Sequence, residues 1–358
     1  MSSAGASRVT PEPKAGERSG VSAVIPAHNA MPLLIDAIDS VLGQTRPPAE
    51  VIVVDDRSTD GTASAVEKRY AHRPEVRVVS GQFGSAAAAR NAGWRAATHP
   101  WIAFLDADDV WFPEKLAVAA ASLEMFSVAG WFVSDGTFKP LDGAEWRSWL
   151  SAYAEIPDPY VGRPIAELLE VNFILTSAVV VRRDLLDAVG GFDANLSHAE
   201  DIDLWIRLAK RSPLTIGTRP LVHYRHQASG LTRQIERRLM GDIALFQRLA
   251  GDPELSVTMR RRARRREALA HFKLAFGSLR SGDRRGTWSR LPKAWMFPER
   301  ALPVAALAMA SVLPQWVLRR MAAQRLGAHA AAQRAFSLSR VELRSDPALL
   351  HAARQASS

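Results

Sequence analysis

The 358-residue sequence contains no cysteine. Disulfide bonds and thiolate metal sites are therefore excluded, and the absence fits a reducing compartment such as the cytoplasm. The first 19 residues are small, polar and proline-containing, which is typical of a flexible tail rather than a signal peptide. Long apolar runs are also lacking. The uncharged segment 301–318 is interrupted by Pro303 and Pro314, so we interpret it first as a buried helix, second as a membrane-surface contact and last as a membrane span.

Acidic residues become sparse after about Asp203, although they are frequent before it, and the formal net charge is +9. Such an excess favours anionic partners, namely phosphates, nucleic acid or an acidic membrane surface. The change in composition predicts a domain boundary after Thr232. The densest basic cluster consists of Arg260, Arg261, Arg262, Arg264, Arg265 and Arg266. Its two interpretations are a solvated helix face and a contact with anionic lipid.

Short apolar runs alternate with helical patterns in the first third of the chain. The runs that predict buried strands are 21–25, 51–54, 76–79 and 101–105. The patterns that predict helices between them are 33–42, 62–70 and 84–97. This alternation predicts an α/β fold with a mainly parallel sheet flanked by helices. Right-handed crossovers would bring the polar loops after three of these strands to one edge of the sheet.

A cluster of carboxylates follows the apolar run 101–105. Asp106, Asp108 and Asp109 would repel one another unless a positive charge lies among them. A hard divalent cation that carries a phosphorylated ligand is the expected occupant, since such cations take oxygen ligands. The alternative is an acidic turn that caps the next helix, with Pro113 in its first turn.

Six segments of the chain resemble the family 2 glycosyltransferases, which have the GT-A fold. They are Val21–Asn29, Val54–Thr62, Ala89–Gly93, Phe104–Asp109, Gly190–Asp193 and Glu200–Trp205. They occur in the family's order and spacing over about residues 20–232, which makes the set specific although each segment alone is weak. The family usually has glycine where this chain has Arg57. Residues 233–358 are not covered.

The resemblance implies a domain organisation. A tail at 1–19 would precede a Rossmann-like GT-A catalytic domain at 20–232. Its nucleotide-binding half would span about 20–112 and its acceptor half about 113–232. A basic α-helical region would occupy 233–358.

The resemblance also implies an inverting transfer of a sugar from a nucleotide diphosphate donor, usually UDP-linked, to an acceptor hydroxyl. Polysaccharide, cell-envelope or glycolipid synthesis is the expected setting. The positions implied for the donor nucleotide are Pro26, Ala27, Asn29, Asp55, Asp56, Arg90, Asp106 and Arg225. Asp108 would hold Mn²⁺ or Mg²⁺, and Asp201 would be the general base, with Glu200 orienting it or contacting the acceptor. The segment His223–His226 resembles a late Tyr-Arg-x-His element, so His226 or His223 would be a further metal ligand.

These residue types suit that chemistry. A metal between Asp108 and the diphosphate would stabilise the negative charge that develops on the leaving group. The acceptor hydroxyl is a poor nucleophile and needs a carboxylate within hydrogen-bond reach. Asp201 lies near a predicted helix start, where the helix dipole keeps a carboxylate ionised. Helix-terminal acids without chemistry are the alternative for Glu200 and Asp201.

Two other classes of protein agree less well with the sequence. A nucleotidyltransferase acting on sugar phosphates would need a glycine-rich basic loop after the first strand, and residues 26–29 do not form one. A nucleic-acid-binding protein is suggested by the charge, but the arginine cluster has few interleaved aromatics and no recognisable module. We therefore expect a nucleotide-sugar donor, a glycan or lipid-linked acceptor, a peripheral contact with anionic membrane at its cytoplasmic face, and no nucleic acid.

Overall fold

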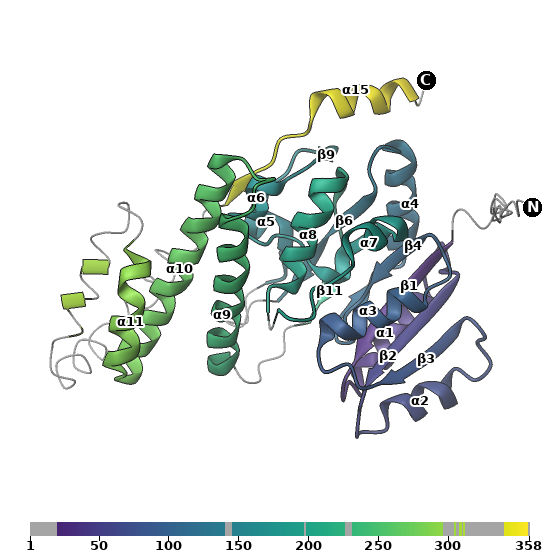
Figure 1. Ribbon diagram of the computed structural model, residues 1–358. Coiled ribbons are helices and arrows are strands. Elements are labelled where there is room, and N and C mark those ends of the chain that lie inside the picture. The colour runs from purple at the N-terminus through teal and green to yellow at the C-terminus, as the bar shows by residue number, and fades with distance from the viewer. Residues whose placement is uncertain are drawn as a thin grey trace, which may run out of the picture.

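The computed structural model describes residues 20–139, 145–196, 198–225, 231–295 and 340–356, together with residues 304, 305, 308, 309 and 311. The described chain has an α/β architecture, in which a ten-stranded sheet flanked by helices is followed by a helical C-terminal region (Figure 1). The predicted fold class is confirmed.

The first half of the sheet is parallel, in the order β3-β2-β1-β4. Its strands are β1 (Val21–Ala27), β2 (Glu50–Asp56), β3 (Val76–Gly81) and β4 (Trp101–Phe104). The helices between them are α1 (Leu33–Leu42), α2 (Thr62–Arg69) and α3 (Ala86–Ala96). Gly93 allows α3 to approach the sheet closely, because a Cβ at this position would lie 2.3 Å from a Val24 methyl group.

The second half of the sheet mixes parallel and antiparallel neighbours. β10 (Val179–Arg182) runs antiparallel to both β4 and β6 (Trp131–Phe138), and β11 (Leu214–Tyr224) pairs in parallel with β6. The edge strands are β5 (Val110–Trp111), β7 (Arg147–Ser148) and β9 (Tyr160–Gly162). The run 174–181 favours a strand throughout, but its middle part forms the 3₁₀ turn Thr176–Ala178, and the strand begins only at Val179.

Short helices cover this half of the sheet. They are α4 (Lys115–Met125), α5 (Trp149–Tyr153), α6 (Ile165–Leu168), α7 (Arg183–Val189) and α8 (Glu200–Arg211). The sheet and these helices share one continuous apolar core, which includes the stacked indoles of Trp131 and Trp205.

The C-terminal region packs back on the second half of the sheet. It comprises α9 (Leu231–Ala250), α10 (Val257–Ser281), α11 (Arg284–Ala294), β12 (Val341–Glu342) and α15 (Pro347–Ala356). β12 pairs with the short strand β8 (Ala154–Glu155), so the end of the described chain returns to the sheet domain (Figure 1). Within the described residues, none of the helices has the length and apolar character needed to cross a membrane. Most of the segment 301–318 lies outside the described residues.

The arginine cluster of α10 divides between two roles. Arg262 donates a 3.1 Å hydrogen bond to the Ala166 carbonyl, and the guanidinium of Arg266 contacts the Glu170 carbonyl. These contacts attach α10 to the segment around α6. The side chains that remain exposed are Arg261, Arg264 and Arg265. The cluster is therefore an exposed helix face on one side and a docking surface for the sheet domain on the other.

Candidate active site

The loops that follow β1, β2 and β4 meet at a cavity of about 310 Å³. This is the common edge that the strand order predicts. The predicted donor-binding residues that line the cavity are Pro26, Ala27, Asn29, Asp56, Arg90 and Asp106, and Asp108 lines it with them. Asp55 and Arg225 are not among its lining residues.

Asp56 is fixed by backbone donors on a neighbouring loop. Its two carboxylate oxygens accept hydrogen bonds of 2.8 Å each from the amides of Phe83 and Gly84. Burial alone would raise the pKa of Asp56, but these donors and Arg57 lower it below its ordinary value. The carboxylate is therefore ionised, and it ties the loop after β2 to the loop after β3.

Arg57 occupies a position where the backbone favours glycine. Its φ is 58°, in the left-handed region, and this explains the glycine that the family usually has there. With arginine at this position the backbone still adopts the left-handed conformation, and the Arg57 side chain forms a 3.2 Å ion pair with Asp56.

Asp55 lies on the face of β2 opposite to Asp56, as the alternation of a strand requires. It is buried, and one of its carboxylate oxygens has no hydrogen-bond partner among the described residues. Adjacency in sequence therefore does not bring Asp55 to the wall of the cavity.

The three aspartates of the acidic loop have different surroundings. Burial and the charge of Asp106 raise the pKa of Asp108, which lines the cavity. Asp109 is only 1% exposed and accepts hydrogen bonds from the Ser177 hydroxyl at 2.5 Å and the Arg225 amide at 3.0 Å. Ser177 Oγ also accepts from the Asp106 amide at 3.0 Å. Asp109 thus orients the loop, whereas Asp106 and Asp108 face the cavity.

A divalent cation fits the two carboxylates that face the cavity, because it would relieve their mutual repulsion. In the part of the chain that the structure describes, no three His, Asp or Glu side chains converge as a metal cage. His226 lies outside the described residues. The His223 ring instead packs against Trp146, with 4.1 Å between ring centroids.

Arg225 contacts the backbone and a side chain of the acidic loop. Its guanidinium contacts the Asp108 carbonyl and forms a 2.9 Å ion pair with Asp36 of α1. A weaker 3.4 Å hydrogen bond reaches the Leu33 carbonyl. These contacts connect the end of β11 to α1 across the acidic loop, so Arg225 is placed to shape the loop rather than to line the cavity.

Arg90 joins the cavity to the first turn of α8. Its Nη2 donates to Asp106 Oδ1 at 2.6 Å and its Nη1 to Glu200 Oε1 at 3.4 Å. The guanidinium lies 5.3 Å from the centre of the Phe192 ring. Burial disfavours the charged form, but the two carboxylates hold the pKa of Arg90 above its ordinary value. Arg90 is therefore a permanent, buried cation between two acidic segments.

Asp201, next to Glu200, has a carboxyl group suited to accepting a proton near neutral pH. Burial and the negative charge of Glu200 raise its pKa to about 6. The Asn172 side-chain amide donates to one oxygen at 2.7 Å, and the Ile202 amide donates to the other at 2.7 Å. The sequence did not indicate a role for Asn172, because this residue lies outside the six segments that resemble the family. A carboxyl with such a pKa is a candidate general base.

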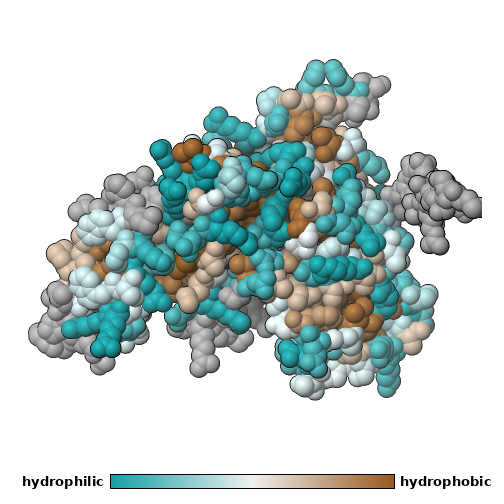
Figure 2. Space-filling view, viewed as in Figure 1, coloured by the Kyte–Doolittle hydropathy of each residue, from teal (hydrophilic) through white to brown (hydrophobic). Residues whose placement is uncertain are grey.

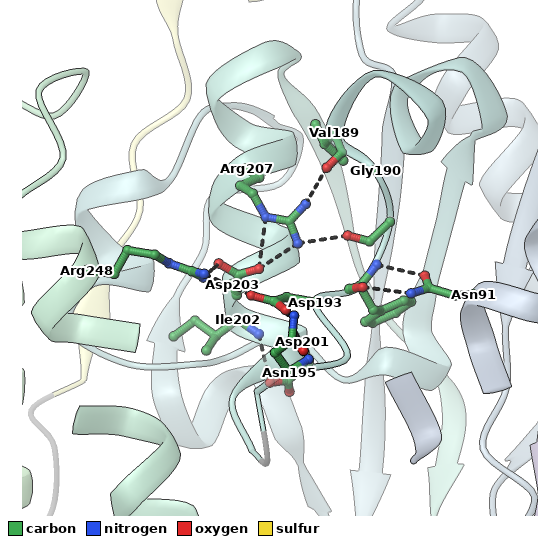
Figure 3. Close-up of polar contacts among 12 residues, drawn as sticks. Asn91, Val189, Gly190, Asp193, Asn195, Asp201, Ile202, Asp203, Arg207 and Arg248 are labelled. Atoms are coloured by element: carbon green, nitrogen blue, oxygen red, sulfur yellow. Dashed lines mark hydrogen bonds and ion pairs between the residues drawn. The ribbon is translucent and has the colours of Figure 1, made fainter. Parts of the chain in front are cut away.

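The segments that precede and form α8 are tied together by a network of ion pairs and hydrogen bonds (Figure 3). The Asp203 carboxylate is 2% exposed and pairs with Arg207 at 2.5 Å and with Arg248. Arg207 also donates to the Val189 and Gly191 carbonyls, at 2.7 and 2.8 Å.

Two further contacts complete this network. Arg248 of α9 reaches Asp193 at 2.8 Å, and Asn91 of α3 exchanges two hydrogen bonds with the Phe192 backbone, at 2.7 and 2.9 Å (Figure 3). In these segments Asp193 and Asp203 therefore pair with arginines that hold α8 in place, whereas Glu200 pairs with Arg90 and Asp201 accepts a hydrogen bond from Asn172.

Comparisons with known proteins agree with this arrangement. The family model described as glycosyl transferase family 2 matches residues 22–190. The amylovoran biosynthesis glycosyltransferase AmsB of Erwinia amylovora is 32% identical over 211 residues, which cover 57% of this chain and 68% of AmsB. An uncharacterized glycosyltransferase of Nostoc sp. is 31% identical over 187 residues, or 48% of this chain. The match covers 54% of the Nostoc protein, so the chain spans about half of that relative's length.

Solved structures share the fold. TarS 1–349 of S. aureus in complex with UDP-GlcNAc has a TM-score of 0.59 at 19% identity, over 80% of this chain and 83% of that one. The mannosyltransferase PcManGT of Pyrobaculum calidifontis in complex with GDP-Man and Mn²⁺ has a TM-score of 0.59 at 22% identity, over 97% and 89% of the two chains. Together with the match to AmsB and the family model, these likenesses mean that the chain belongs to glycosyltransferase family 2.

Proposed function

We propose that the protein is an inverting glycosyltransferase that moves a sugar from a nucleotide diphosphate donor, with a UDP-sugar favoured, to an acceptor hydroxyl. The observation that carries this proposal is Arg90, which contacts Asp106 in the donor cavity and Glu200 beside Asp201. One buried guanidinium thus connects a nucleotide-sized cavity to a carboxyl with a pKa of about 6. TarS was solved with UDP-GlcNAc, and AmsB is named for polysaccharide synthesis, which supports a UDP-sugar and an envelope or polysaccharide acceptor.

In this proposal each half of the reaction has its own residues. The Asp201 carboxylate takes the proton of the acceptor hydroxyl as the hydroxyl oxygen forms a bond to the anomeric carbon. The bond from that carbon to the diphosphate breaks on the opposite side, which inverts the configuration. Asn172 and the Ile202 amide hold the Asp201 carboxylate in place during proton transfer. Arg90 supplies a fixed positive charge between the donor and the base.

Asp108, with Asp106 beside it, would hold Mn²⁺ or Mg²⁺. When bound, such an ion neutralises negative charge on the diphosphate leaving group. We further propose that residues 20–232 form the catalytic domain and that the basic helical region after them serves the acceptor side. The expected location is the cytoplasm, with a peripheral contact at the inner face of the plasma membrane.

A thermal-shift screen of nucleotide sugars on the full-length protein, with and without Mn²⁺, tests the proposed donor class. A ligand at a hundred times its Kd stabilises the folded state by about 2.7 kcal/mol, which raises the Tm by several degrees. We expect UDP-sugars to give the largest shift, and only with Mn²⁺. A shift produced by nucleoside triphosphates and not by any nucleotide sugar would favour a nucleotidyltransferase instead.

The transfer rate should fall with acidity through pH 6. Asp201 must be ionised to accept a proton, and burial together with Glu200 raises its pKa to about 6, while Arg90 opposes that rise. Below this pH the protonated form dominates, so kcat/KM is expected to drop about tenfold per pH unit. Asn172→Ala removes a donor that favours the ionised form, so the inflection should move to higher pH. An inflection that stays unchanged in Asn172→Ala would remove Asp201 from the role of base.

Arg248→Ala should lower both stability and turnover, because Arg248 connects α9 to Asp193 and to the buried Asp203 of α8. Arg248 is 49% exposed and Asp203 keeps Arg207, so we expect a loss of only about 1–2 kcal/mol in urea unfolding. With the base-bearing helix loosened, kcat should fall while the KM for the donor is unchanged. Arg248→Lys should restore part of the rate, and Arg261→Ala, an exposed arginine on α10, is the control.

A further inference from the structure

Lys115, the first residue of α4, is a charged residue that lies inside the protein. Hydrophilic residues cover much of the face seen in Figure 2, whereas Lys115 is 0% exposed. Burial lowers the pKa of Lys115 to about 7, and no carboxylate of the described chain opposes this effect. A buried ammonium without a counter-ion costs stability, because the desolvation of a charge is unfavourable. Packing alone therefore does not explain a lysine at this position.

The ammonium group of Lys115 contacts a backbone carbonyl, a hydroxyl and two aromatic rings. It donates a 2.8 Å hydrogen bond to the Ala178 carbonyl and a weaker one of 3.4 Å to Ser134 Oγ. The ring centres of Trp111 and Phe132 lie 5.4 and 5.6 Å from the ammonium nitrogen. The faces of such rings attract a cation electrostatically. The shortest polar contact of Lys115 is thus with the 3₁₀ turn that precedes β10.

A second side chain binds the same 3₁₀ turn. The indole Nε1 of Trp111 donates to the Ser177 carbonyl at 2.8 Å, and Trp111 is 3% exposed. Trp111 and Lys115 therefore bind two consecutive carbonyls of the turn. β5 and the start of α4, which carry these two donors, directly follow the acidic loop in the chain. The segment after the loop is thus attached to the turn at two positions.

The same turn connects the two ends of the acidic loop. Ser177 Oγ accepts a hydrogen bond from the Asp106 amide at 3.0 Å and donates one to Asp109 Oδ2 at 2.5 Å. Asp108 lies between these two residues and lines the donor cavity with Asp106. A shift of the turn would weaken at least one of the two hydrogen bonds, because their strength falls steeply with distance and angle. The position of the turn therefore decides the shape of the loop that faces the cavity.

We infer that Lys115 is a positioning residue for the acidic loop. It holds the Ala178 carbonyl, and this keeps the Ser177 hydroxyl between the Asp106 amide and the Asp109 carboxylate. A lysine suits this task because its ammonium is a donor at the end of a long side chain, which reaches the turn from α4. The positioning is a property of the free protein, whereas its importance for the donor and the cation rests on the proposed function.

Hydrogen exchange of the full-length protein without ligand, measured by mass spectrometry, tests the positioning in Lys115→Met. Methionine has a similar length but no donor, so the Ala178 carbonyl loses its hydrogen bond with the ammonium. We expect the amides of Asp106 and Asp109 to exchange about five times faster, because their acceptors lie in the turn and in the loop itself. Exchange in β1 and β2 should not change. Thermal unfolding should stay within a few degrees of the wild type, since removal of a buried charge offsets the lost hydrogen bond.

A second variant and a matched control accompany this measurement. Trp111→Phe removes the other donor to the turn and should give the same local increase, so the inference is tested even if Lys115→Met does not fold. The control is Trp131→Phe, because Trp131 is also a buried indole that donates to a backbone carbonyl. Its acceptor, the Ser212 carbonyl at 3.2 Å, follows α8 and is not part of the turn. Trp131→Phe should leave exchange in the acidic loop unchanged.

A double variant shows whether Lys115 acts through Ser177. Without the Ser177 hydroxyl the turn loses its two hydrogen bonds with the loop. Lys115→Met combined with Ser177→Ala should therefore exchange the loop amides no faster than Ser177→Ala alone. In each single variant the Kd for UDP, measured by calorimetry with Mn²⁺, should rise about tenfold, as for other residues that orient a metal ligand.

Three results would overturn the inference. The first is unchanged exchange of the acidic loop in both Lys115→Met and Trp111→Phe. The second is a double variant in which the two effects multiply, because Lys115 would then act independently of Ser177. The third is faster exchange throughout the chain with a large fall in Tm, which would make Lys115 a residue of the core only. Since exchange is measured without donor or metal, a wild-type protein that binds no UDP would reject the proposed function and leave the positioning intact.

Discussion

Asp201→Asn is expected to abolish sugar transfer while leaving donor binding nearly intact. The substitution keeps the shape of the side chain but removes the group that accepts the proton of the acceptor hydroxyl. Loss of a general base lowers kcat by about 10²–10⁴-fold. The donor cavity is lined by residues of the β1, β2 and β4 loops and of α3, and Asp201 is not among them. The Kd for UDP, measured by calorimetry with Mn²⁺, should therefore change less than about twofold.

The control is Asp187→Asn, which makes the same change at an exposed position of α7. It should have wild-type kcat and wild-type UDP affinity. If Asp201→Asn transfers sugar at nearly the wild-type rate, another group takes the proton and the assignment of the base is wrong. Glu200, which already pairs with Arg90, is then the first residue to examine.

Asp108→Asn is expected to abolish activity and to weaken donor binding in the same variant. Burial and the neighbouring Asp106 raise the pKa of Asp108, so its ionised form needs a positive charge close by. Without this carboxylate the site would lose both a cation ligand and the charge that attracts the cation. We expect a fall of about 10³-fold in kcat/KM, as for the loss of other groups that stabilise developing charge. The contrast with Asp201→Asn is that the Kd for UDP should rise at least tenfold.

Metal removal provides the matching experiment. Wild-type protein treated with EDTA should lose activity and recover it with Mn²⁺ or Mg²⁺, while Asp108→Asn should not recover at the same metal concentration. The Asp187→Asn control should respond like the wild type. Full activity after exhaustive chelation would mean that the charge on the leaving group is met by Arg90, which lines the donor cavity, without an ion.

Most of the nucleotide-binding half could be predicted from local patterns. The apolar runs that become β1, β2 and β4 are nearly continuous, because strands buried on both faces carry apolar side chains on each side. Their crossovers determine which loops share an edge, so Pro26, Asp56 and Asp106 could be assigned to one site before any contact was known.

The strands in the second half of the sheet could not be predicted from local patterns, because a polar segment is buried there. β6 contains Ser134, Asp135 and Gly136, which interrupt the apolar pattern of a strand. Asp135 is 3% exposed, and its carboxylate accepts hydrogen bonds from the Leu150 amide at 2.8 Å and the Ser148 hydroxyl at 2.6 Å. A buried carboxylate needs such hydrogen-bond donors, and here they come from residues 148 and 150, beyond the end of the strand. The sequence of β6 alone therefore does not indicate a strand.

The sequence by itself therefore determined the α/β class, the shared edge of the sheet and the carboxylates that gather there. Only the tertiary structure decided how those carboxylates are used. Ser177 donates a hydrogen bond to the buried Asp109, Asn172 donates one to Asp201, and Arg90 reaches Glu200 across 110 positions of the chain. The physical reason is that periodicity reports which face of an element is buried, whereas the pairing of charges depends on which distant elements the antiparallel strand β10 and helix α8 bring to that edge.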